Sequence, residues 1–411
     1  MLIYIKKIMK KKIDILKTVN ENYSKYNPST YQSLINNKEV QKLKKSRSNL
    51  FFKLKFPPDL FKNKDLLELG AGSGQFTLAY DNFGSRCTLV EYDPRSVINA
   101  KNIFKKYSKN SFKIVQSDIF KFKSSKKYSL VSCTGVAQHT KDPIGCLSKA
   151  CGFVKSNGFI IFSTNTPSGN LQNAIMRYVL FKISNSNKEI LKNSKILFLD
   201  YLKKVSRGGG RKIDNIIGDQ FLNYKEETIS TQKVLEIFNA HKISLYSNFP
   251  KVDDISSILD LDATSTREKE NIKTKYINES NGIYLKEHQW MTYTNNKNQK
   301  AKLKKYFKNI ETLKNKISDS FNNLNYNDFN INLKNFKKTS NSYVEEIKKK
   351  NLIKMFDLNH HKLFFKEVND LLDLCEKYKS IAQIKSLLKK NKCLFKKNFG
   401  VGVTYYIGLK K

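Results

Sequence analysis

A regular alternation of short apolar runs with helix-like segments constrains the fold of this chain more than any other feature. Five runs have the nearly continuous apolar character of buried strands: 66–69, 87–91, 112–115, 128–133 and 159–163. Three segments between them have the apolar spacing of helices: 75–82, 96–107 and 143–154. Serial alternation of this kind predicts an α/β fold with a doubly wound, mostly parallel sheet that helices cover on both faces.

A glycine-rich turn, LELGAGSGQF, follows the first of these runs. Gly70, Gly72 and Gly74 stand at alternate positions, and glycine tolerates positive φ and lets a ligand approach the backbone closely. The dinucleotide fingerprint needs its third glycine where Gln75 stands, and the lysine of a P-loop is missing. Glu68, just before the loop, would repel a diphosphate but suits a ligand that carries a positive amine. The turn therefore favours a ligand with a positive amine over a diphosphate.

Further carboxylates stand where the second and third runs end. Glu91 ends one run and Asp118 follows the next, and parallel sheets bind ligands beyond the carboxyl ends of their strands. Asp93, before Pro94, fits the N-cap of the next helix. Purely structural roles remain open for two of these carboxylates. Glu68 can cap the amides of its own loop, and Asp118 can be a turn residue.

These motifs resemble those of the class I S-adenosylmethionine-dependent methyltransferases. The E-x-G-x-G-x-G pattern is similar to motif I of that family, and the resemblance extends over roughly residues 56–165. TGVAQH, at 134–139, resembles the fourth-strand motif of the ubiquinone/menaquinone-biosynthesis type. The resemblance implies a seven-stranded Rossmann-like sheet with a helical lid, and S-adenosyl-L-methionine as cofactor. It also implies a set of cofactor-binding residues: Glu68, Gly70, Ala71, Gly72, Gly74, Glu91, Tyr92, Asp118, Ile119, Thr134 and Gly135.

The resemblance assigns roles to some of these residues. Glu91 is expected to accept hydrogen bonds from the ribose hydroxyls, Asp118 to bind the adenine amino group, and Ile119 to lie against the ring. A general base is needed only where the acceptor must lose a proton. His139 is the catalytic candidate by position, and a substrate contact or a structural role stays open for it.

Three further residues are candidates for a general base, and all lie in one later segment: Tyr224, Glu226 and Glu227. That segment, DQFLNYKE at 219–226, resembles a D-Q-Y-x-H-P-x-E stretch in a group of bacterial methyltransferases of poorly defined substrate. Asn223 replaces the histidine of that stretch, so any base or metal role of the histidine is absent here, and we expect no metal. The segment is expected to belong to a lid within 168–228, with 165–169 on its other side.

The chain divides into four parts by composition and pattern. We expect a basic helical segment at 1–55, the S-adenosylmethionine-binding domain at 56–250, and a mostly helical, lysine-rich appendage or insertion at 251–398. The spacing of apolar residues predicts helices within the appendage at 303–317, 363–375 and 381–388. VGVTYYIGL, at 401–409, predicts a strand, so 399–411 is expected to close the main sheet.

The net charge of +40 comes from lysine, since only seven of the 76 basic residues are arginine. Abundant lysine, asparagine and isoleucine are typical of codon drift in an AT-rich genome. Nucleic-acid binders rely on arginine for bidentate contacts, so solvated lysine is favoured over a polyanion site. The stretches 1–64 and 301–411 are more basic than the middle, which leaves contact with nucleic acid open.

The cysteines and the first residues bear on the compartment. Six cysteines without a CxxC pair indicate a reducing, cytoplasmic environment without structural zinc. No apolar run reaches the roughly 18–20 residues of a membrane span. MLIYIKKIMKKKIDILK places apolar residues before the charges, the wrong order for a signal peptide. Its helical spacing favours packing onto the domain and leaves peripheral contact with a membrane open.

The function expected from these features is methyl transfer to a small-molecule acceptor, whether oxygen, nitrogen or carbon, by in-line displacement (EC 2.1.1.-). An RNA methyltransferase is the main alternative. The chain lacks, however, the N/D-P-P-Y/F/W tetrapeptide of exocyclic-amine enzymes and the Pro-Cys pair of pyrimidine C5 enzymes. A non-catalytic adaptor that keeps the fold is the third reading.

Overall fold

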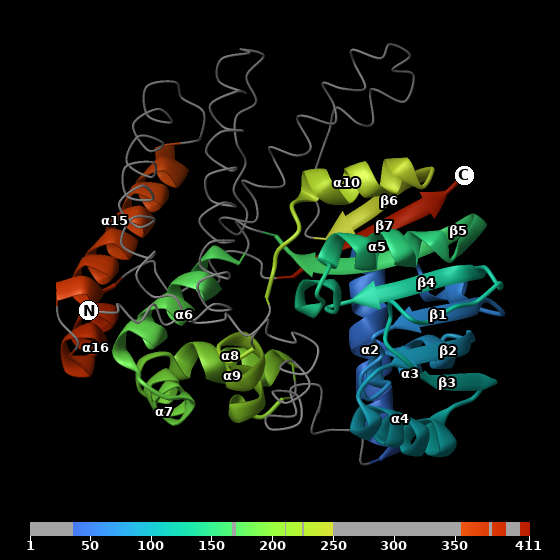
Figure 1. Ribbon diagram of the computed structural model, residues 1–411, viewed down its shortest axis with the longest axis horizontal. Helices are drawn as coiled ribbons and strands as arrows, with labels where there is room; N and C mark the ends of the chain where they lie inside the picture. The colour runs from blue at the N-terminus through green and yellow to red at the C-terminus, as the bar shows by residue number, and fades with distance from the viewer. Residues whose placement is uncertain are drawn as a thin grey trace, which may run out of the picture.

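The computed structural model describes residues 36–166, 170–209, 211–223, 226–249, 355–377, 380–391 and 403–411 (Figure 1). The helix expected in the first residues and the one expected at 303–317 lie outside these ranges.

A seven-stranded sheet forms the centre of the fold, with the strand order β3-β2-β1-β4-β5-β7-β6. The first five strands are mutually parallel, and β7 is antiparallel to both of its neighbours. The predicted doubly wound, mostly parallel sheet is therefore confirmed. The strands are β1 (Asp65–Leu69), β2 (Arg86–Glu91), β3 (Phe112–Gln116), β4 (Tyr128–Thr134), β5 (Val154–Asn165), β6 (Ile243–Phe249) and β7 (Val403–Lys410).

Helices cover both faces of the sheet, each over its own apolar core. Neighbouring strand residues alternate between the two cores, since Leu66 packs on one side and Leu67 on the other. The first core is covered by α2 (Asn37–Lys53), the 3-10 helix η1 (Pro58–Phe61), α3 (Gln75–Asn82) and α4 (Pro94–Tyr107). The second is covered by α5 (Pro143–Gly152) and α10 (Thr231–Ala240).

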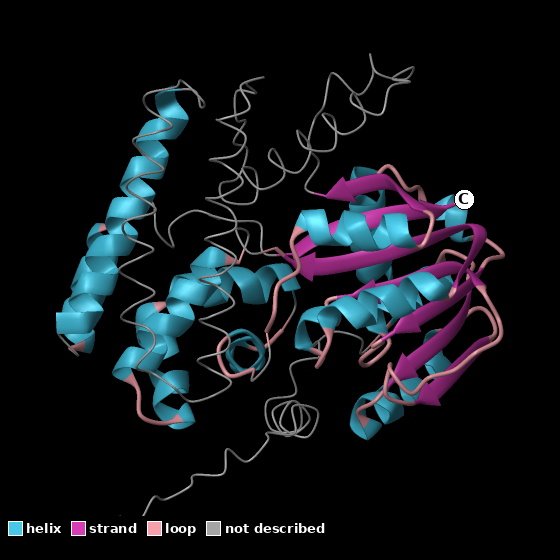
Figure 2. Ribbon diagram, turned by 45° about the horizontal axis from the view of Figure 1, so that its top comes forward, coloured by secondary structure: helices cyan, strands magenta, loops and turns pink. Residues whose placement is uncertain are grey.

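The remaining described helices form a separate body, here called the helical unit, around a third apolar core. Met176 and Val179 of α6 share this core with Val368 and Leu371 of α15. Segments on either side of β6 in the chain therefore pack as one body, next to the strand ends toward which the arrowheads of β4 and β5 point (Figure 2). The helical unit contains α6 (Leu171–Ile183), α7 (Asn187–Leu197), α8 (Leu199–Gly209), α9 (Ile213–Gln220), α15 (Met355–Lys377) and α16 (Ile381–Lys390).

Most element boundaries agree with the sequence pattern, and the start of β5 is the main difference. The sequence pattern predicted a strand at 159–163, whereas β5 already begins at Val154, and its pairing with β4 jumps from Tyr128↔Val154 to Leu130↔Phe159. Asn157 takes a φ of 59° in this irregular stretch. The predicted cap at Asp93 is confirmed, since its carboxylate accepts a hydrogen bond from the amide of Ser96 at 2.9 Å.

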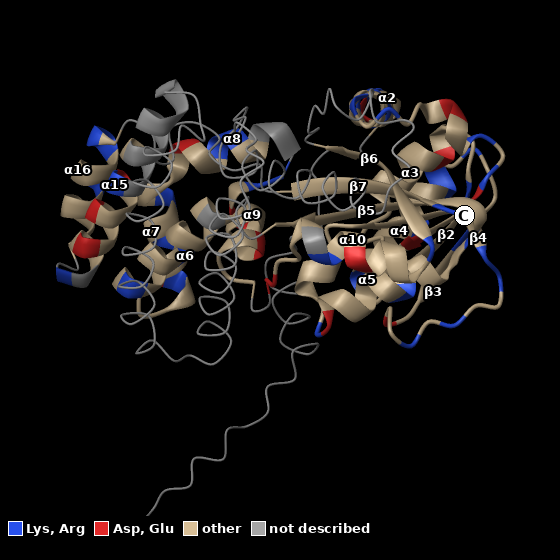
Figure 3. Ribbon diagram, turned by 90° about the horizontal axis from the view of Figure 1, so that it is seen from above, with Lys and Arg blue, Asp and Glu red and all other residues tan. Residues whose placement is uncertain are grey.

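Lysine and arginine positions are spread over both the sheet domain and the helical unit in the described part of the chain (Figure 3). The preference for solvated lysines over a polyanion site stays a prediction. A separate search of the described helices finds none with the length and apolar character that crossing a bilayer requires.

The strand expected near residues 401–409 is β7, which lies between β5 and β6. Gly408 sits where β7 meets its neighbours most closely. A Cβ added there would come 2.8 Å from Cε2 of Phe238 and 3.0 Å from Cγ2 of Ile160. Gly152, at the end of α5, has open space at the same position, with nothing within 4 Å.

We predict that Gly408→Ala destabilises the protein by about 1–3 kcal/mol, because the added methyl overpacks the interface of β7 with β6 and α10. The measurement is the free energy of unfolding from chemical denaturation. Gly152→Ala is the matched control and should leave that free energy unchanged within about 0.5 kcal/mol. Equal stability of the two variants would contradict the close approach at Gly408.

Candidate active site

The glycine loop after β1 adopts the backbone conformations that its sequence requires. Gly70, Gly72 and Gly74 have φ values of 70°, 55° and 73°, in the left-handed region that favours glycine. The amides of Gly70 and Ala71 donate to the carbonyl oxygen of Val90 at 2.8 and 3.1 Å, which ties the loop to the end of β2. The loop is thus held where β1 and β2 end.

Glu91, at the end of β2, lies directly against this loop. Its Oε2 accepts a hydrogen bond from the amide of Gly72 at 2.7 Å, and its Oε1 accepts from the amides of Tyr92 and Asp93, each at 2.9 Å. Burial raises the pKa of Glu91, and these amides oppose that rise. An ionised carboxylate has about four acceptor sites, so three amides leave room for one further donor.

Glu68 lies beneath the loop and is only 3% exposed. Its carboxylate accepts hydrogen bonds from the hydroxyl of Thr77 on α3 and, at 3.2 Å, from that of Ser132 on β4. Burial raises the pKa of Glu68 to about 7, against the lowering effect of these two hydroxyls. The carboxyl group thus joins β1, α3 and β4 below the loop.

Arg47 on α2 completes this cluster, and sequence reasoning missed it. The side chain is buried, and its Cζ lies 3.3 Å from the centroid of the Phe76 ring, in the first turn of α3. The guanidinium also lowers the pKa of Glu68 and so partly offsets the effect of burial. Helix α2 therefore brings a cation to the base of the glycine loop.

We predict that Glu68→Gln removes a pH-dependent loss of stability. The folded pKa of Glu68, about 7, lies above its ordinary value of 4.5, so the folded state holds the proton more tightly. Its stabilising contribution is complete below pH 4.5 and is lost as the pH rises through 7, on the order of 3 kcal/mol in all. Chemical denaturation of wild type and variant between pH 4.5 and 8 measures the difference, and parallel profiles would contradict the assignment.

Asp118 and its neighbours follow β3. Oδ1 of Asp118 accepts a hydrogen bond from the amide of Phe120 at 2.7 Å, so the carboxylate serves the turn that the sequence left open as an alternative. Ile119 is buried in the core under α5. Tyr92, which follows Glu91, is 37% exposed. The structure therefore places the expected adenine-side residues at the ends of two neighbouring strands.

The segment after β4 runs along the glycine loop. Gly135 has a φ of 71°, and its amide donates to the carbonyl oxygen of Ser163 at 3.3 Å. A Cβ added to Gly70 would come 2.6 Å from Cγ1 of Val136, so the two segments are in contact. Thr134 ends β4, and the 3-10 helix η2 (Ala137–His139) carries His139.

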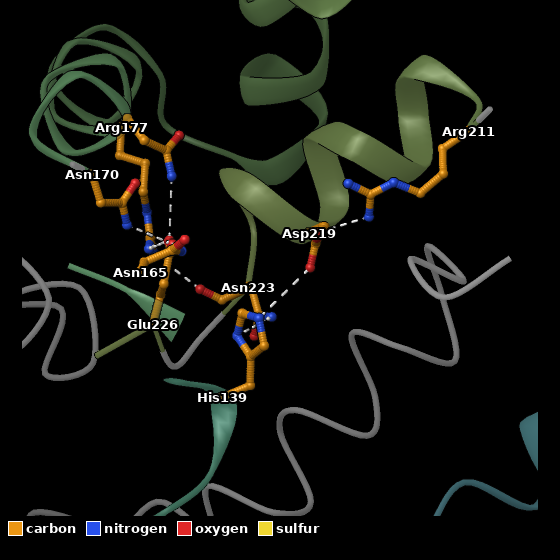
Figure 4. A network of polar contacts seen from close by, with 9 residues as sticks. His139, Asn165, Asn170, Arg177, Arg211, Asp219, Asn223 and Glu226 are labelled. Atoms are coloured by element: carbon orange, nitrogen blue, oxygen red, sulfur yellow. Dashed lines mark hydrogen bonds and ion pairs between the residues drawn. The ribbon is translucent and has the colours of Figure 1, made fainter. Parts of the chain in front are cut away.

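A buried carboxylate, Glu226, connects the sheet to the helical unit (Figure 4). Its Oε1 accepts hydrogen bonds from the side-chain amides of Asn165 at 2.9 Å and Asn170 at 2.7 Å. Its Oε2 pairs with Nη1 of Arg177 at 2.9 Å and lies 3.4 Å from Nδ2 of Asn173. We call this meeting of η2, Asn165, the start of α6, residues 219–223 and Glu226 the sheet–helix joint.

Contacts within this arrangement involve two of the three later candidates for a general base, Glu226 and Glu227. The buried ion pair with Arg177 commits the carboxylate of Glu226 to holding the joint, and burial lowers the pKa of Arg177 while Glu226 opposes that shift. The amide of Glu227 donates to the carbonyl oxygen of Gln138 at 2.9 Å. Tyr224 lies outside the described residues.

His139 lies next to two residues of the segment 219–226, which resembles a stretch of the bacterial group. Nδ2 of Asn223 lies 3.0 Å from its Nδ1, and Oδ1 of Asp219 lies 4.0 Å from its Nε2 (Figure 4). Nη1 of Arg211 pairs with the other oxygen of Asp219 at 2.8 Å. Asn223, which replaces the histidine of the resembling sequences, thus contacts His139.

Among the residues that the structure describes, no cluster of three or more His, Cys, Asp or Glu side chains could hold a metal ion. The polar groups described at this site are carboxylates, amides and one imidazole around a glycine loop at the carboxyl ends of β1, β2 and β4.

Comparison with known proteins agrees with this geometry. Residues 41–195 match the model of a family described as a methyltransferase domain. Together with the sheet order, the match identifies this part of the chain as a class I S-adenosylmethionine-dependent methyltransferase domain, and it confirms the recognition made from the motifs. The cofactor of this class is S-adenosyl-L-methionine, as expected from the sequence. No curated protein matches the chain significantly.

Solved structures with detectable similarity include several methyltransferases. One is an S-adenosylmethionine-dependent methyltransferase from Clostridium acetobutylicum ATCC 824, at 17% identity over 31% of this chain and 51% of that chain, with a TM-score of 0.26. Another is PKMT2 from Rickettsia typhi in complex with AdoHcy, at 16% identity over 54% of this chain and 51% of that chain, with a TM-score of 0.39.

A third similar structure is the glycopeptide N-methyltransferase MtfA complexed with S-adenosyl-L-methionine, at 18% identity over 29% of this chain and 54% of that chain, with a TM-score of 0.26. The chain thus spans about half the length of the structures that it matches. At these identities and TM-scores the similarities identify neither the acceptor nor the reaction of this chain.

Proposed function

We propose that the chain is an S-adenosylmethionine-dependent methyltransferase that acts on a small-molecule acceptor. The observation that carries the proposal is the contact between Glu91 and the glycine loop. This contact places a hydrogen-bond acceptor beside three glycines of positive φ, where the adjacent strands β1 and β2 end. The spare acceptor site of Glu91 fits a ribose hydroxyl, and the glycines allow a ligand close to the backbone.

The other expected cofactor contacts follow from the same edge of the sheet. Asp118 and Ile119 are assigned to the adenine. The methionine part is assigned to the ends of β1 and β4, which Gly70 and Gly135 follow. Glu68 beneath the loop favours a ligand with positive charge, since its carboxylate is buried where screening by water is weak. Bound S-adenosyl-L-methionine supplies an electrophilic methyl group on a sulfonium.

The work left to the protein is to position the acceptor and to exclude water. His139 is the proposed catalytic residue, since it lies on η2 beside the glycine loop and contacts the lid segment through Asn223. The helical unit next to these strand ends is proposed to act as the lid, with 251–398 as an insertion that extends it and 399–411 as the strand that closes the sheet.

We predict micromolar binding of S-adenosylhomocysteine, measured by isothermal titration calorimetry. Glu91→Ala should weaken binding roughly tenfold or more, because it removes the carboxylate assigned to the ribose. Gly72→Arg should abolish binding, because φ is 55° at this position and the side chain would fill the loop. Asp214→Ala on the exposed surface of α9 is the control and should bind like wild type. Absence of binding by the wild-type protein would favour the adaptor reading.

The choice of a small-molecule acceptor is tested by transfer of a labelled methyl group. The purified protein is incubated with labelled S-adenosyl-L-methionine and with separated metabolite, lipid and RNA fractions of the source cell. We expect label in the metabolite fraction, and we expect any bound RNA to dissociate with added salt without becoming labelled. Incorporation into RNA would overturn the small-molecule assignment while leaving the cofactor assignment intact.

A further inference from the structure

Three glutamates of the candidate site are bound by different kinds of hydrogen-bond partner. Glu91 is held by three backbone amides, and Glu226 by an arginine and by side-chain amides of asparagine. These nitrogen groups only donate, so they favour the ionised carboxylate. The partners of Glu68 are instead two hydroxyls, those of Thr77 and Ser132.

A hydroxyl can donate to a carboxylate or accept from a carboxylic acid by turning its hydrogen. The two contacts of Glu68 therefore suit both of its protonation states, although the side chain is only 3% exposed. Protonation of Glu91, by contrast, would remove an acceptor site from a carboxylate that accepts from three amides. Because burial raises the pKa of Glu68 to about 7, both of its forms are populated at neutral pH.

The other charged and titratable groups around Glu68 leave this titration to it. Arg47 on α2 lowers the pKa of Glu68, and Glu91 on β2 raises it. Three further titratable side chains lie close by: Tyr80 on α3, Cys87 on β2 and Cys133 on β4. Burial raises the pKa of the first two, and contact with the thiol of Cys146 raises that of the third, so all three stay neutral.

Glu68 and Ser132 lie just before the two segments assigned to the methionine part of the cofactor. They are register partners, with Glu68 in β1 two residues before Gly70 and Ser132 in β4 three residues before Gly135. At about 3.3 Å per strand residue, the carboxyl group lies within roughly 10 Å of these segments. Water screens weakly in a buried site, so a charge on the ligand changes the proton affinity of Glu68 at this distance.

The cofactor and its product differ by one charge. S-adenosyl-L-methionine carries a sulfonium, whereas S-adenosylhomocysteine carries a neutral thioether. An ionised Glu68 stabilises the sulfonium, and a protonated one does not. We propose that the charge of Glu68 follows that of the ligand: the side chain releases its proton when the sulfonium cofactor binds and takes one up from water when the thioether product replaces it.

This inference rests on the proposed methyltransferase function and adds a means of distinguishing cofactor from product. Glu68 is a specificity-determining residue in this account. As the pH rises through 7, Glu68 ionises and the preference for the cofactor grows. As the pH falls, Glu68 is protonated whichever ligand is bound, and the product competes better with the cofactor.

The test measures the Kd of both ligands for the full-length protein by isothermal titration calorimetry between pH 6 and 8. The ratio of the Kd of S-adenosylhomocysteine to that of S-adenosyl-L-methionine should rise with pH. Glu68→Gln keeps a hydrogen-bonding side chain and reports the contribution of the ligands' own amino groups. We expect the rise in wild type to exceed that in Glu68→Gln roughly threefold or more.

The same calorimetry counts the protons. At pH 7, titrations in PIPES and imidazole buffers, which differ in ionisation enthalpy, give the number of protons released on binding. Wild type should release more protons with S-adenosyl-L-methionine than with S-adenosylhomocysteine, and Glu68→Gln should reduce this difference.

Ser132→Ala separates the charge of Glu68 from structural support. Against the effect of burial, the hydroxyl of Ser132 lowers the pKa of Glu68, so its loss should move the midpoint of the Kd ratio to higher pH. Ser85→Ala is the matched control. It removes another buried hydroxyl, which donates to the carbonyl oxygen of Phe61 at 2.8 Å just before β2 begins, and it should leave the midpoint unchanged.

The outcomes distinguish this inference from the function on which it rests. If S-adenosylhomocysteine fails to bind the wild-type protein, the proposed function fails. If both ligands bind and their Kd ratio changes with pH equally in wild type and Glu68→Gln, this inference alone is overturned. It is also wrong if Ser132→Ala moves the midpoint no further than Ser85→Ala does.

Discussion

The buried carboxylate of Glu226 is the interaction on which the relation between the two bodies of this protein depends. The sheet domain has apolar cores on its two faces and the helical unit has its own, and the hydrogen bonds of Glu226 with Asn165 and Asn170 connect the two bodies. Removing one partner of the pair with Arg177 would leave an uncompensated buried charge, which typically costs about 3–5 kcal/mol. Such a junction favours one relative arrangement of the two bodies, because a shifted arrangement would leave the buried charge unpaired.

The sheet, its order and the helices around it could be predicted because their signals are local. Apolar period and turn residues identified five parallel strands, and the positive φ values of the glycine loop follow from glycine itself. The start of β5 was placed late because a turn-like stretch around Asn157 interrupts a strand that continues through it. Boundaries of this kind depend on pairing with β4, which a local pattern does not contain.

The site was predictable only in part, for a similar reason. Glu68 stands two residues before Gly70 and Glu91 ends the next predicted strand, so their place at the loop was apparent. Arg47 and Arg177, by contrast, come from helices that reach the site through tertiary packing. One signal could have found them. Where lysine is the default cation, the seven arginines stand out, and a planar guanidinium is what stacking on Phe76 or pairing with a buried carboxylate requires.

The position of β7 has a consequence for how the chain is made. In the described sheet, β6 pairs only with β7, yet 153 residues separate the end of one from the start of the other. At 5–20 residues per second, a ribosome needs roughly 8–30 s to bridge that interval. Until then the nascent chain has an exposed edge on β5 and an unpaired β6. Until β7 is made, these unpaired strand edges are open to pairing with other chains, which is a risk of aggregation during synthesis.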